Sequence, residues 1–380
     1  MNDMRRESLT GQTVELRERL SATTLLHGLL FALAVLAVAL AALVSARHFE
    51  PKVDAQVLDG RMAQDFEHHY DQSFPARGFG ISLWAAIDYL LFDEAQTGVV
   101  AGRDGWLYTD EEFNVVDGAE RVVEHNLALV DRVRDALAAK NVQLVVAVVP
   151  AKARVYPEHL RAGHLPPALH RGLYDHAQAA LVAAEVAHPD LFDPLEAGKA
   201  RAPTFLRTDT HWTPFGARLA ARSVAASVRQ ELPAPATRSA YTTTVQPTRE
   251  HRGDLFNFLP LEPYFGWLLP RADTITPTQT TADAGGDLFG ASAAPRIALV
   301  GTSYSANPNW NFVGALEQQL GEDIANYAKD GEGPFVPMDR YLHGGDFAAA
   351  PPQLVIWEIP ERYLAMPQKD TTLAAPAAAH

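Results

Sequence analysis

The 380-residue chain contains 46 Asp plus Glu against 32 Lys plus Arg, and 47% of its residues are apolar. This acidic balance argues against a general nucleic-acid-binding protein, which needs a basic surface for phosphates. The sequence contains no cysteine, which excludes disulfides, thiolate metal sites and a cysteine nucleophile. Length and composition fit one large α/β domain with an additional segment.

Residues 25–46 form one long apolar stretch near the N-terminus and predict a membrane-spanning helix. At 1.5 Å per residue this helix would extend about 33 Å, enough to cross the roughly 30 Å hydrocarbon core of a bilayer. More basic residues precede the stretch than closely follow it: Arg5, Arg6, Arg17 and Arg19 against Arg47 and Lys52. The positive-inside tendency therefore predicts that residues 1–24 lie in the cytoplasm and the long C-terminal part outside it.

A cleavable signal peptide is the alternative to this anchor. Residues 44–46 (Val-Ser-Ala) are of the kind that signal peptidase accepts, and cleavage there would release a soluble periplasmic protein that begins near Arg47. The stretch is longer than the usual signal-peptide apolar region of about 7 to 15 residues. We therefore favour a single-pass anchor that is retained in the inner membrane.

After a helical lead-in at residues 55–95, the chain alternates between strand and helix patterns. A Gly-Arg-Asp-Gly turn at 102–105 precedes a short strand. Continuous apolar runs are typical of strands covered on both faces, and apolar residues near helical spacing predict helices. The strands are expected at 143–150, 296–300, 324–328 and 354–359, and the helices at 122–137 and 172–187. This alternation predicts an α/β fold with a mostly parallel sheet, whose ligands bind beyond the carboxyl ends of the strands.

Two stretches interrupt the alternation. Residues 233–250 and 272–295 are rich in Thr, Pro, Ala and Gly, which indicates long loops or an insertion beside the site rather than core elements. The last residues, 365–380, have the composition of a disordered tail.

The segment Asp209-Thr210-His211-Trp212-Thr213-Pro214 places a carboxylate and an imidazole directly before a helix. Thr213 is a good N-cap and Pro214 suits the first helical position. In such a loop Asp209 can accept the Nδ1 proton of His211, which leaves Nε2 free as a general base. A lone Asp-x-His also fits an ordinary turn in which Asp209 caps backbone amides and His211 packs in the core.

A second polar cluster, Gly301-Thr302-Ser303-Tyr304-Ser305, follows the apolar strand at 296–300. Asn307 and Pro308 look like the start of a helix that runs to about residue 320. Ser303 therefore lies at a strand-to-helix turn, where its hydroxyl is exposed while nearby amides point at a developing oxyanion. Ser305 is the rival nucleophile, and a simple chain turn is the alternative for the whole cluster.

These blocks resemble the SGNH-like O-acetyltransferases of bacterial exopolysaccharide acetylation, a family that includes the periplasmic alginate O-acetylation proteins. The resemblance covers residues 55–364 and rests mainly on D-T-H-W-T at 209–213 and G-T-S-Y-S at 301–305. Four further blocks support it: G-R-D-G-W-L-Y at 102–108, V-P-A-K at 149–152, R-G-D-L at 252–255 and W-E-I-P-E-R-Y at 357–363. It implies a three-layer α/β/α SGNH-hydrolase-like domain. Residue by residue, it makes Ser303 the nucleophile, His211 the base and Asp209 its orienting partner.

The sequence departs from the wider SGNH hydrolase pattern in its motif order. The Asp-His pair precedes the serine and has one intervening residue instead of two, which implies a permuted order. A catalytic triad is still possible, because it requires a particular geometry rather than a particular chain order. The chain also lacks a long segment after residue 364, so the C-terminal carbohydrate-binding module of some relatives is not expected.

The candidate substrate-binding residues are Tyr304, Lys152 and Arg252. The alternative for Lys152 is an ordinary solvated side chain that does not contact substrate. The alternative for Arg252 is an ion pair with Asp254 within the loop. Backbone donors at Gly331 and Gly333 are a further option, which tight turning alone would explain. Neither an HExxH motif nor a phosphate loop occurs, so we expect no metal and no other cofactor.

The leading hypothesis is an O-acetyltransferase that acts through an acetyl-serine intermediate on a periplasmic, alginate-like exopolysaccharide. The resemblance implies a membrane-bound O-acyltransferase partner as acetyl donor, and a polysaccharide or another acetyltransferase of the same pathway as acceptor. The alternatives are a carbohydrate acetylesterase, which uses the same triad with water, and a non-catalytic assembly protein of a polysaccharide secretion complex. An intact triad in the folded protein would argue against the assembly protein.

Overall fold

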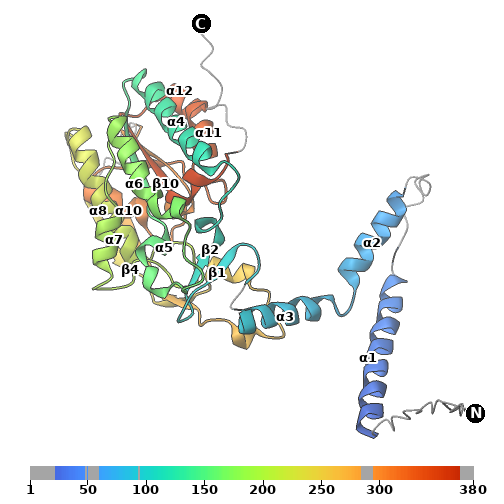
Figure 1. Cartoon of the computed structure of the whole chain (residues 1–380). Coiled ribbons are helices and arrows are strands. Elements are labelled where there is room, and N and C mark those ends of the chain that lie inside the picture. Colours follow the sequence, from blue (N-terminus) through green and yellow to red (C-terminus); the bar gives the residue numbers. More distant parts are fainter. Residues whose placement is uncertain (1–21, 48, 50–59, 93–94, 284–293, 369–380) are drawn as a thin grey trace, which may run out of the picture. The chain divides into compact units, whose positions relative to one another are not determined.

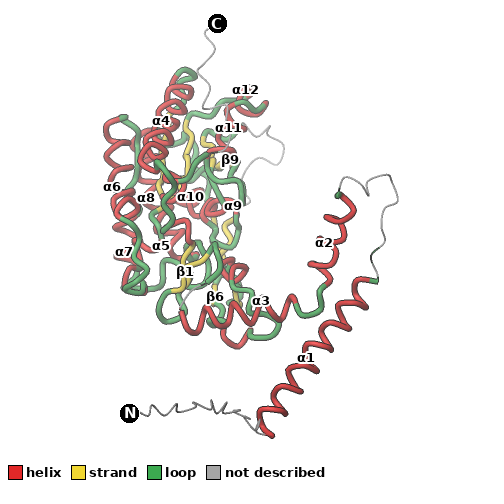
Figure 2. Tube along the Cα trace, turned by 45° about the vertical axis from the view of Figure 1, so that its right-hand side comes forward, coloured by secondary structure: helices red, strands yellow, loops and turns green. Residues whose placement is uncertain are grey.

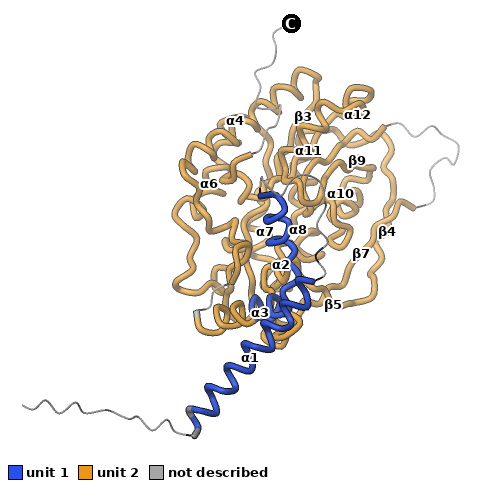
Figure 3. Tube along the Cα trace, turned by 90° about the vertical axis from the view of Figure 1, so that its right-hand side faces the viewer, with its two compact units in different colours: residues 1–82 blue, residues 83–380 orange. Residues whose placement is uncertain are grey.

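The computed structural model describes residues 22–47, 49, 60–92, 95–283 and 294–368. It divides into two compact units, Met1–Ser82 and Leu83–His380, which are coloured separately in Figure 3. Residues 1–21, Lys52, the middle of the expected loop at 272–295 and most of the expected tail lie outside the described residues.

The first unit contains α1 (Ala22–Ala46), α2 (Arg61–Ser73) and the beginning of α3 (Arg77–Ile87). Within α1, Leu25–Ala46 is long and apolar enough to cross a membrane, a test that a signal sequence also passes. Nearly all described side chains of α1 are exposed, as expected of a helix whose apolar surface covers every face. The helical lead-in expected at 55–95 is present as α2, α3 and a short π-helix, Asp88–Phe92.

A four-stranded parallel sheet forms the centre of the second unit (Figures 1 and 2), in the order β3-β10-β8-β9. Its strands are β3 (Gln143–Val149), β8 (Ile297–Val300), β9 (Ile324–Asn326) and β10 (Leu354–Pro360). The two central strands, β10 and β8, are buried along their whole length. This burial explains their continuous apolar sequences, since a strand covered on both faces cannot alternate with polar residues.

Helices cover both faces of this sheet, so the predicted three-layer α/β/α arrangement is confirmed. In β3, Val145, Ala147 and Val149 face one core and Leu144 and Val146 the other, because successive strand residues point to opposite sides. The first face packs against α7 (Phe192–Gly198), α8 (Pro214–Glu231) and α10 (Phe312–Leu320). The second packs against α4 (Ala119–Ala138), α6 (Ala168–Ala183), α11 (Phe335–Leu342) and α12 (Gly345–Ala349).

In the described part of the chain, three two-stranded antiparallel ribbons lie outside the sheet. The first pairs β1 (Val99–Ala101) with β2 (Leu107–Thr109), across the predicted turn at 102–105. The other two pair β4 (Tyr241–Val245) with β7 (Thr278–Ala282), and β5 (Arg249–His251) with β6 (Asp273–Ile275). The stretches at 233–250 and 272–295, expected as long loops or an insertion rather than core elements, therefore lie outside the central sheet but contain strands, whose threonines suit the pleated conformation.

The carboxyl ends of β3, β8 and β10 lead into short helices rather than directly into long ones. These are α5 (Lys152–Val155), α9 (Ser303–Ala306) and a 3-10 helix, Glu361–Ala365. Ala365 is buried, so the folded unit includes the residue at which the tail was expected to begin.

Candidate active site

The Asp209–His211 loop is the first part of the candidate site. As predicted, α8 begins at Pro214, with Thr213 as its N-cap accepting a hydrogen bond from the Gly216 amide at 3.1 Å. His211 approaches the carboxyl edge of the sheet from this pre-helical loop and not from the end of a sheet strand. The loop is closed locally by a single bridge between Phe205 and Trp212.

The nucleophile turn, residues 301–311, is the second part. Ser303 is the first residue of α9, directly after the Thr302 N-cap at the end of β8. The expectation that one helix runs from Asn307 to about residue 320 is wrong, because α10 begins only at Phe312. Its N-cap, Asn311, has a left-handed backbone with φ 52°, a conformation that Asn tolerates better than most residues. The intervening turn therefore separates α9 from α10.

Asp209, His211 and Ser303 form one hydrogen-bonded chain. Asp209 Oδ1 lies 2.6 Å from His211 Nδ1, and His211 Nε2 lies 2.6 Å from Ser303 Oγ. With Nδ1–H donating to Asp209, Nε2 is the acceptor for the Ser303 hydroxyl. Asp209 and His211 are buried, whereas Ser303 is half-buried. The residues chosen from sequence are thus within reach for proton transfer from the hydroxyl to the imidazole.

A second histidine, His251 at the end of β5, shares the same carboxylate and was missed from sequence. Its Nε2 donates to Asp209 Oδ2 at 2.8 Å. Burial by itself raises the pKa of Asp209, but hydrogen bonds from His211 and His251 outweigh it and hold that pKa below its ordinary value of 3.8. The hydrogen bond to Asp209 in turn raises the pKa of His251. Asp209 is therefore held ionised between two imidazoles.

Asp254 holds the backbone of the same loop. Its amide donates to Asp209 Oδ2 at 3.2 Å, and its Oδ1 accepts from the Thr210 amide at 2.8 Å. The close approach requires glycine next to it, since a Cβ at Gly253 would lie 1.9 Å from the Thr208 carbonyl oxygen. These contacts explain the R-G-D-L block as a support of the acid–base pair.

Lys152 lies beneath the Asp209–His211 loop, so the expectation of a solvated lysine side chain is wrong. Its side chain is fully buried, and Nζ donates to the carbonyl oxygens of Leu107, Arg207 and Asp209 at 2.6, 3.0 and 2.9 Å. Burial lowers the pKa of Lys152 to about 8. The ammonium also lies over the Trp106 ring, 5.2 Å from its centre. Its three protons are committed to the protein, which removes it from direct substrate binding.

Glu358 of β10 holds the nucleophile turn. Its carboxylate accepts from the Thr302 amide at 2.8 Å and from the hydroxyls of Thr302 and Ser305 at 3.0 Å. The Ser305 hydroxyl thereby points at a buried carboxylate, while Ser303 faces His211. A Cβ at Gly301 would lie 2.5 Å from the Glu358 carboxylate, so glycine is required where β10 passes the turn.

Tyr304 and Arg252, the other expected substrate-binding residues, differ in exposure. Tyr304 is buried, and its hydroxyl donates to the Thr210 carbonyl at 2.8 Å, which links the two loops. Arg252 is exposed and forms its ion pair with Glu262 at 3.0 Å rather than with Asp254. Only Arg252 is therefore accessible to a ligand.

The ligand atoms of Asp209, His211 and Asp254 lie within 4.8 Å of one another, close enough to be considered for a metal ion. The hydrogen bonds described above already engage both Asp209 oxygens and one oxygen of Asp254. His211 Nδ1 would have to turn its proton away from Asp209 to bind a metal. The arrangement fits a proton-transfer chain better than a cation site.

Comparison with known proteins agrees with this geometry. The family described as an SGNH hydrolase-like domain, acetyltransferase AlgX, matches residues 99–361. The probable alginate O-acetylase AlgJ of Pseudomonas syringae pv. tomato is 47% identical over 321 residues, covering 83% of this chain and 82% of that protein. The corresponding Pseudomonas aeruginosa protein is 48% identical, covering 84% and 83%.

Two solved structures have the same fold. The O-acetyltransferase domain of Pseudomonas putida AlgJ matches with a TM-score of 0.67 and 48% identity, covering 72% of this chain and 94% of that chain. Pseudomonas aeruginosa AlgX matches with a TM-score of 0.57 and 26% identity, covering 75% and 67%. The chain therefore belongs to the AlgX family of SGNH hydrolase-like acetyltransferase domains.

Proposed function

We propose that this protein transfers acetyl groups through an acetyl ester on Ser303. The carrying observation is the continuous chain from Asp209 Oδ1 through His211 to Ser303 Oγ, with 2.6 Å at both steps. A serine hydroxyl is a weak nucleophile by itself, and an adjacent oriented imidazole is what activates it. Asp209 fixes the tautomer of His211 and stabilises the imidazolium that forms.

In the first half-reaction, His211 Nε2 takes the Ser303 proton while Oγ bonds to the acetyl carbonyl carbon. The bond from that carbon to the donor's leaving group then breaks, and the imidazolium returns its proton to the leaving group. In the second half-reaction, a sugar hydroxyl gives its proton to His211 and attacks the acetyl carbon. The bond from that carbon to Ser303 Oγ then breaks, and the imidazolium returns the proton to Oγ. The Ser303 amide, at the first position of α9, is our proposed donor to the oxyanion.

We propose alginate, or a closely similar polyuronate, as the acceptor. The support is the name of the curated relatives, probable alginate O-acetylases, which are 47% and 48% identical to this chain. A carbohydrate acetylesterase would use the same residues and differ in giving the acetyl group to water. The non-catalytic assembly role is disfavoured because a surface used only for docking has no need of a hydrogen-bonded Asp-His-Ser chain.

The acetyl donor and the location follow from the same proposal. Residues 1–24 would be cytoplasmic, 25–46 the retained inner-membrane anchor, and 55–364, together with the buried Ala365, the periplasmic acetyltransferase domain. A membrane-bound O-acyltransferase would then supply the acetyl group across the membrane. Recovery of a soluble periplasmic form that begins near Arg47 would replace the anchor with a cleaved signal.

The test is turnover of an activated acetyl ester by the wild type and variants. We expect Ser303→Ala and His211→Ala each to lower kcat/KM at least about 1000-fold, and Asp209→Ala to leave more residual activity because Asp209 only orients the imidazole. Ser305→Ala is the matched control and should retain turnover. Activity that survives in Ser303→Ala but is lost in Ser305→Ala would move the nucleophile, and indifference to all four changes would favour the assembly role.

A further inference from the structure

The exposed apolar side chains of the second unit are concentrated in two segments. Eleven large apolar residues are exposed among its described residues, and seven of them lie within 83–91 and 258–267. The other four are scattered singly, at positions 115, 165, 182 and 245. Single exposed apolar residues are normal on a soluble surface, whereas a concentration of them marks a surface that binds another apolar surface.

The two segments pack against each other through one small core. The end of α3 and the π-helix after it contribute Ala86 to this core, and the segment after β5 contributes Phe256. The side of each segment that faces the core is buried, so the apolar residues on its other side face outward around the same core. We call the most exposed of these outward-facing residues the apolar patch: Trp84, Leu90, Leu91, Phe258 and Trp267.

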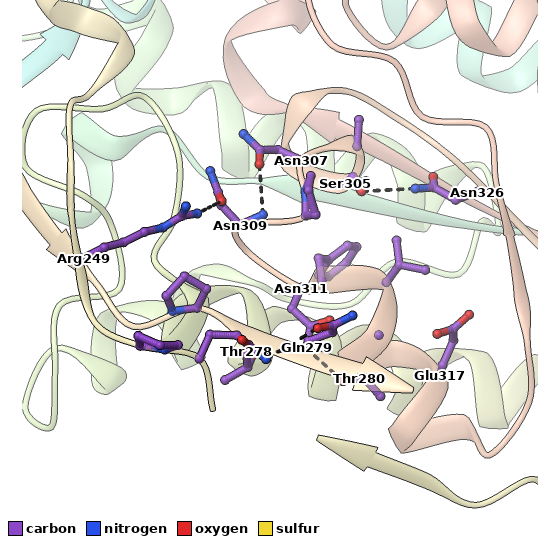
Figure 4. A pocket seen from close by; sticks show the side chains of 18 residues that line it. Arg249, Thr278, Gln279, Thr280, Ser305, Asn307, Asn309, Asn311, Glu317 and Asn326 are labelled. Carbon is purple, nitrogen blue, oxygen red and sulfur yellow. Dashed lines mark hydrogen bonds between the residues drawn. The ribbon is translucent and has the colours of Figure 1, made fainter. Parts of the chain in front are cut away.

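The apolar patch is connected to the supports of the Asp209–His211 loop. Asp254 accepts a hydrogen bond from the Thr210 amide at 2.8 Å, and it begins the short 3-10 helix that ends at Phe258. None of the five patch residues lines the groove beside the nucleophile turn, whose walls carry carboxamides and hydroxyls (Figure 4). The patch is therefore a separate surface, which lies one short helix away from Asp254.

The composition of the apolar patch favours a lipid surface. Trp84 and Trp267 are 65% and 76% exposed, and tryptophan is enriched where proteins meet the headgroup region of a bilayer. Within 83–91 and 255–271 the described charged residues are Asp88, Glu262 and Arg271, so attraction to anionic lipids is not the driving force. Contact with a bilayer would instead come from apolar side chains that enter its interface.

The proposed anchor brings a bilayer within reach of the patch. Residues 47–82 connect α1 to the second unit. With α2 and the first part of α3 as helices, this connection spans at most about 90 Å. A tether of this kind makes even a weak contact effective, because the second binding event becomes intramolecular. A partner protein would have to be recruited, whereas the bilayer is always present.

We infer that the apolar patch binds the headgroup region of the bilayer that holds α1. The inference goes beyond the proposed transfer reaction and rests on the proposed retention of the anchor. Contact of the patch with lipid keeps the Asp209–His211–Ser303 chain close to the membrane across which the acetyl group is to be supplied.

The test is tryptophan fluorescence of the full-length protein in phosphatidylcholine vesicles, with and without bromine on the acyl chains. Bromine quenches tryptophans that contact the lipid. Four of the six tryptophans are buried, so Trp84 and Trp267 are the two that lipid can reach. The wild type should be quenched, Trp84→Phe and Trp267→Phe should each lose part of the quenching, and the double variant should lose all of it.

Leu91→Glu keeps both tryptophans and places a charge in the patch. It should lower the quenching at least about twofold, since the apolar area that enters the lipid is smaller. Val182→Glu, at a similarly exposed apolar residue on α6, is the matched control and should leave the quenching unchanged. Equal quenching in these two variants would overturn the inference. So would wild-type quenching no greater than that of the double tryptophan variant, the result expected of a surface that binds a partner protein.

Flotation of the same vesicles separates this inference from the proposed anchor. The wild type and every variant should float with the lipid, because α1 is unchanged in all of them. A wild type that floats while Leu91→Glu does not would contradict the anchor and support lipid binding by the patch. A wild type that fails to float would contradict both proposals.

Discussion

The Asp209–His211 loop and the nucleophile turn meet at one point but are held by different contacts. The Asp209–His211 loop is held by side chains from several other segments, namely Lys152, His251, Asp254 and Asp273. The nucleophile turn is held at residues 302 and 305 by one buried carboxylate, Glu358, on the neighbouring strand, and elsewhere by hydrogen bonds of Tyr304 and Asn311. The placement of His211, the proton acceptor, therefore depends on many residues that are distant in sequence. The placement of Ser303 is determined largely by its position at the end of β8.

Among substitutions that test this difference between the two loops, a change of Lys152 is expected to have the largest effect on stability. Lys152→Met removes the ammonium donor of three carbonyl oxygens, of which that of Arg207 keeps the Leu107 amide as a donor. Each buried group left unsatisfied costs about 1–3 kcal/mol. Removal of a buried charge offsets part of this cost. We expect the free energy of unfolding to fall by about 3 kcal/mol, measured by urea denaturation of the full-length protein.

Lys140→Met is the matched control, because Lys140 is an exposed lysine just after α4. Its effect should be less than about 0.5 kcal/mol. If the two lysine variants were equally stable, Lys152 would not support the Asp209–His211 loop.

The second-largest effect on stability is expected at His251, and its size depends on pH. The hydrogen bond to Asp209 raises the pKa of His251 above 6.5, so the folded state binds this proton more tightly than the unfolded state does. The extra stability is therefore fully present below pH 6.5 and is lost as the pH rises through the folded-state pKa. His251→Gln should lower the free energy of unfolding by about 1 kcal/mol at pH 5.5, with a smaller difference at pH 8.5.

His176→Gln is the control for His251, since His176 contacts Glu124 at 3.0 Å on the surface. Urea midpoints at both pH values compare the two substitutions. A His251→Gln effect that grows with pH would contradict a protonated His251 on Asp209.

The smallest effect is expected at Glu358. Glu358→Gln keeps one oxygen for the Thr302 amide and changes a buried, acceptor-only group into one that also donates. Burial raises the pKa of Glu358, so ionisation of the wild type opposes folding as the pH rises above 4.5. The free energy of unfolding at pH 7 should therefore change by less than about 1 kcal/mol. A loss as large as that of Lys152→Met would mean that both loops are held equally.

The parts of the site that follow from neighbouring residues were predictable from sequence. Thr213 and Pro214 start α8 where their residue types predict, and the apolar run before Gly301 forms β8 as expected. The six sequence blocks behind the resemblance also converge in space: they supply Lys152, Asp254 and Glu358 as supports. Their physical role, however, was visible only in the folded chain.

The remaining errors involve contacts between distant residues. His251 is 42 residues from Asp209 in sequence. It lies directly after a stretch whose composition indicated loops, so no local pattern linked the two. Lys152 was read as solvated because lysine usually is, and its three acceptor carbonyls come from two segments that are both distant from it in sequence. Asn307 and Pro308 have the residue types of a helix start, yet α10 begins four residues later than expected. Its N-cap, Asn311, forms hydrogen bonds to Thr278 and Thr280 of β7, which are distant in sequence.

The position of the acetyl group after rapid quenching tests the central claim most directly. Trypsin would release one peptide, residues 297–329, that contains both Ser303 and Ser305, so fragmentation must assign the acetyl group between them. After reaction with an activated acetyl ester, the wild type should carry one acetyl group on Ser303, and His211→Ala should carry almost none. An acetyl group on Ser305, or equal labelling with and without His211, would contradict the account.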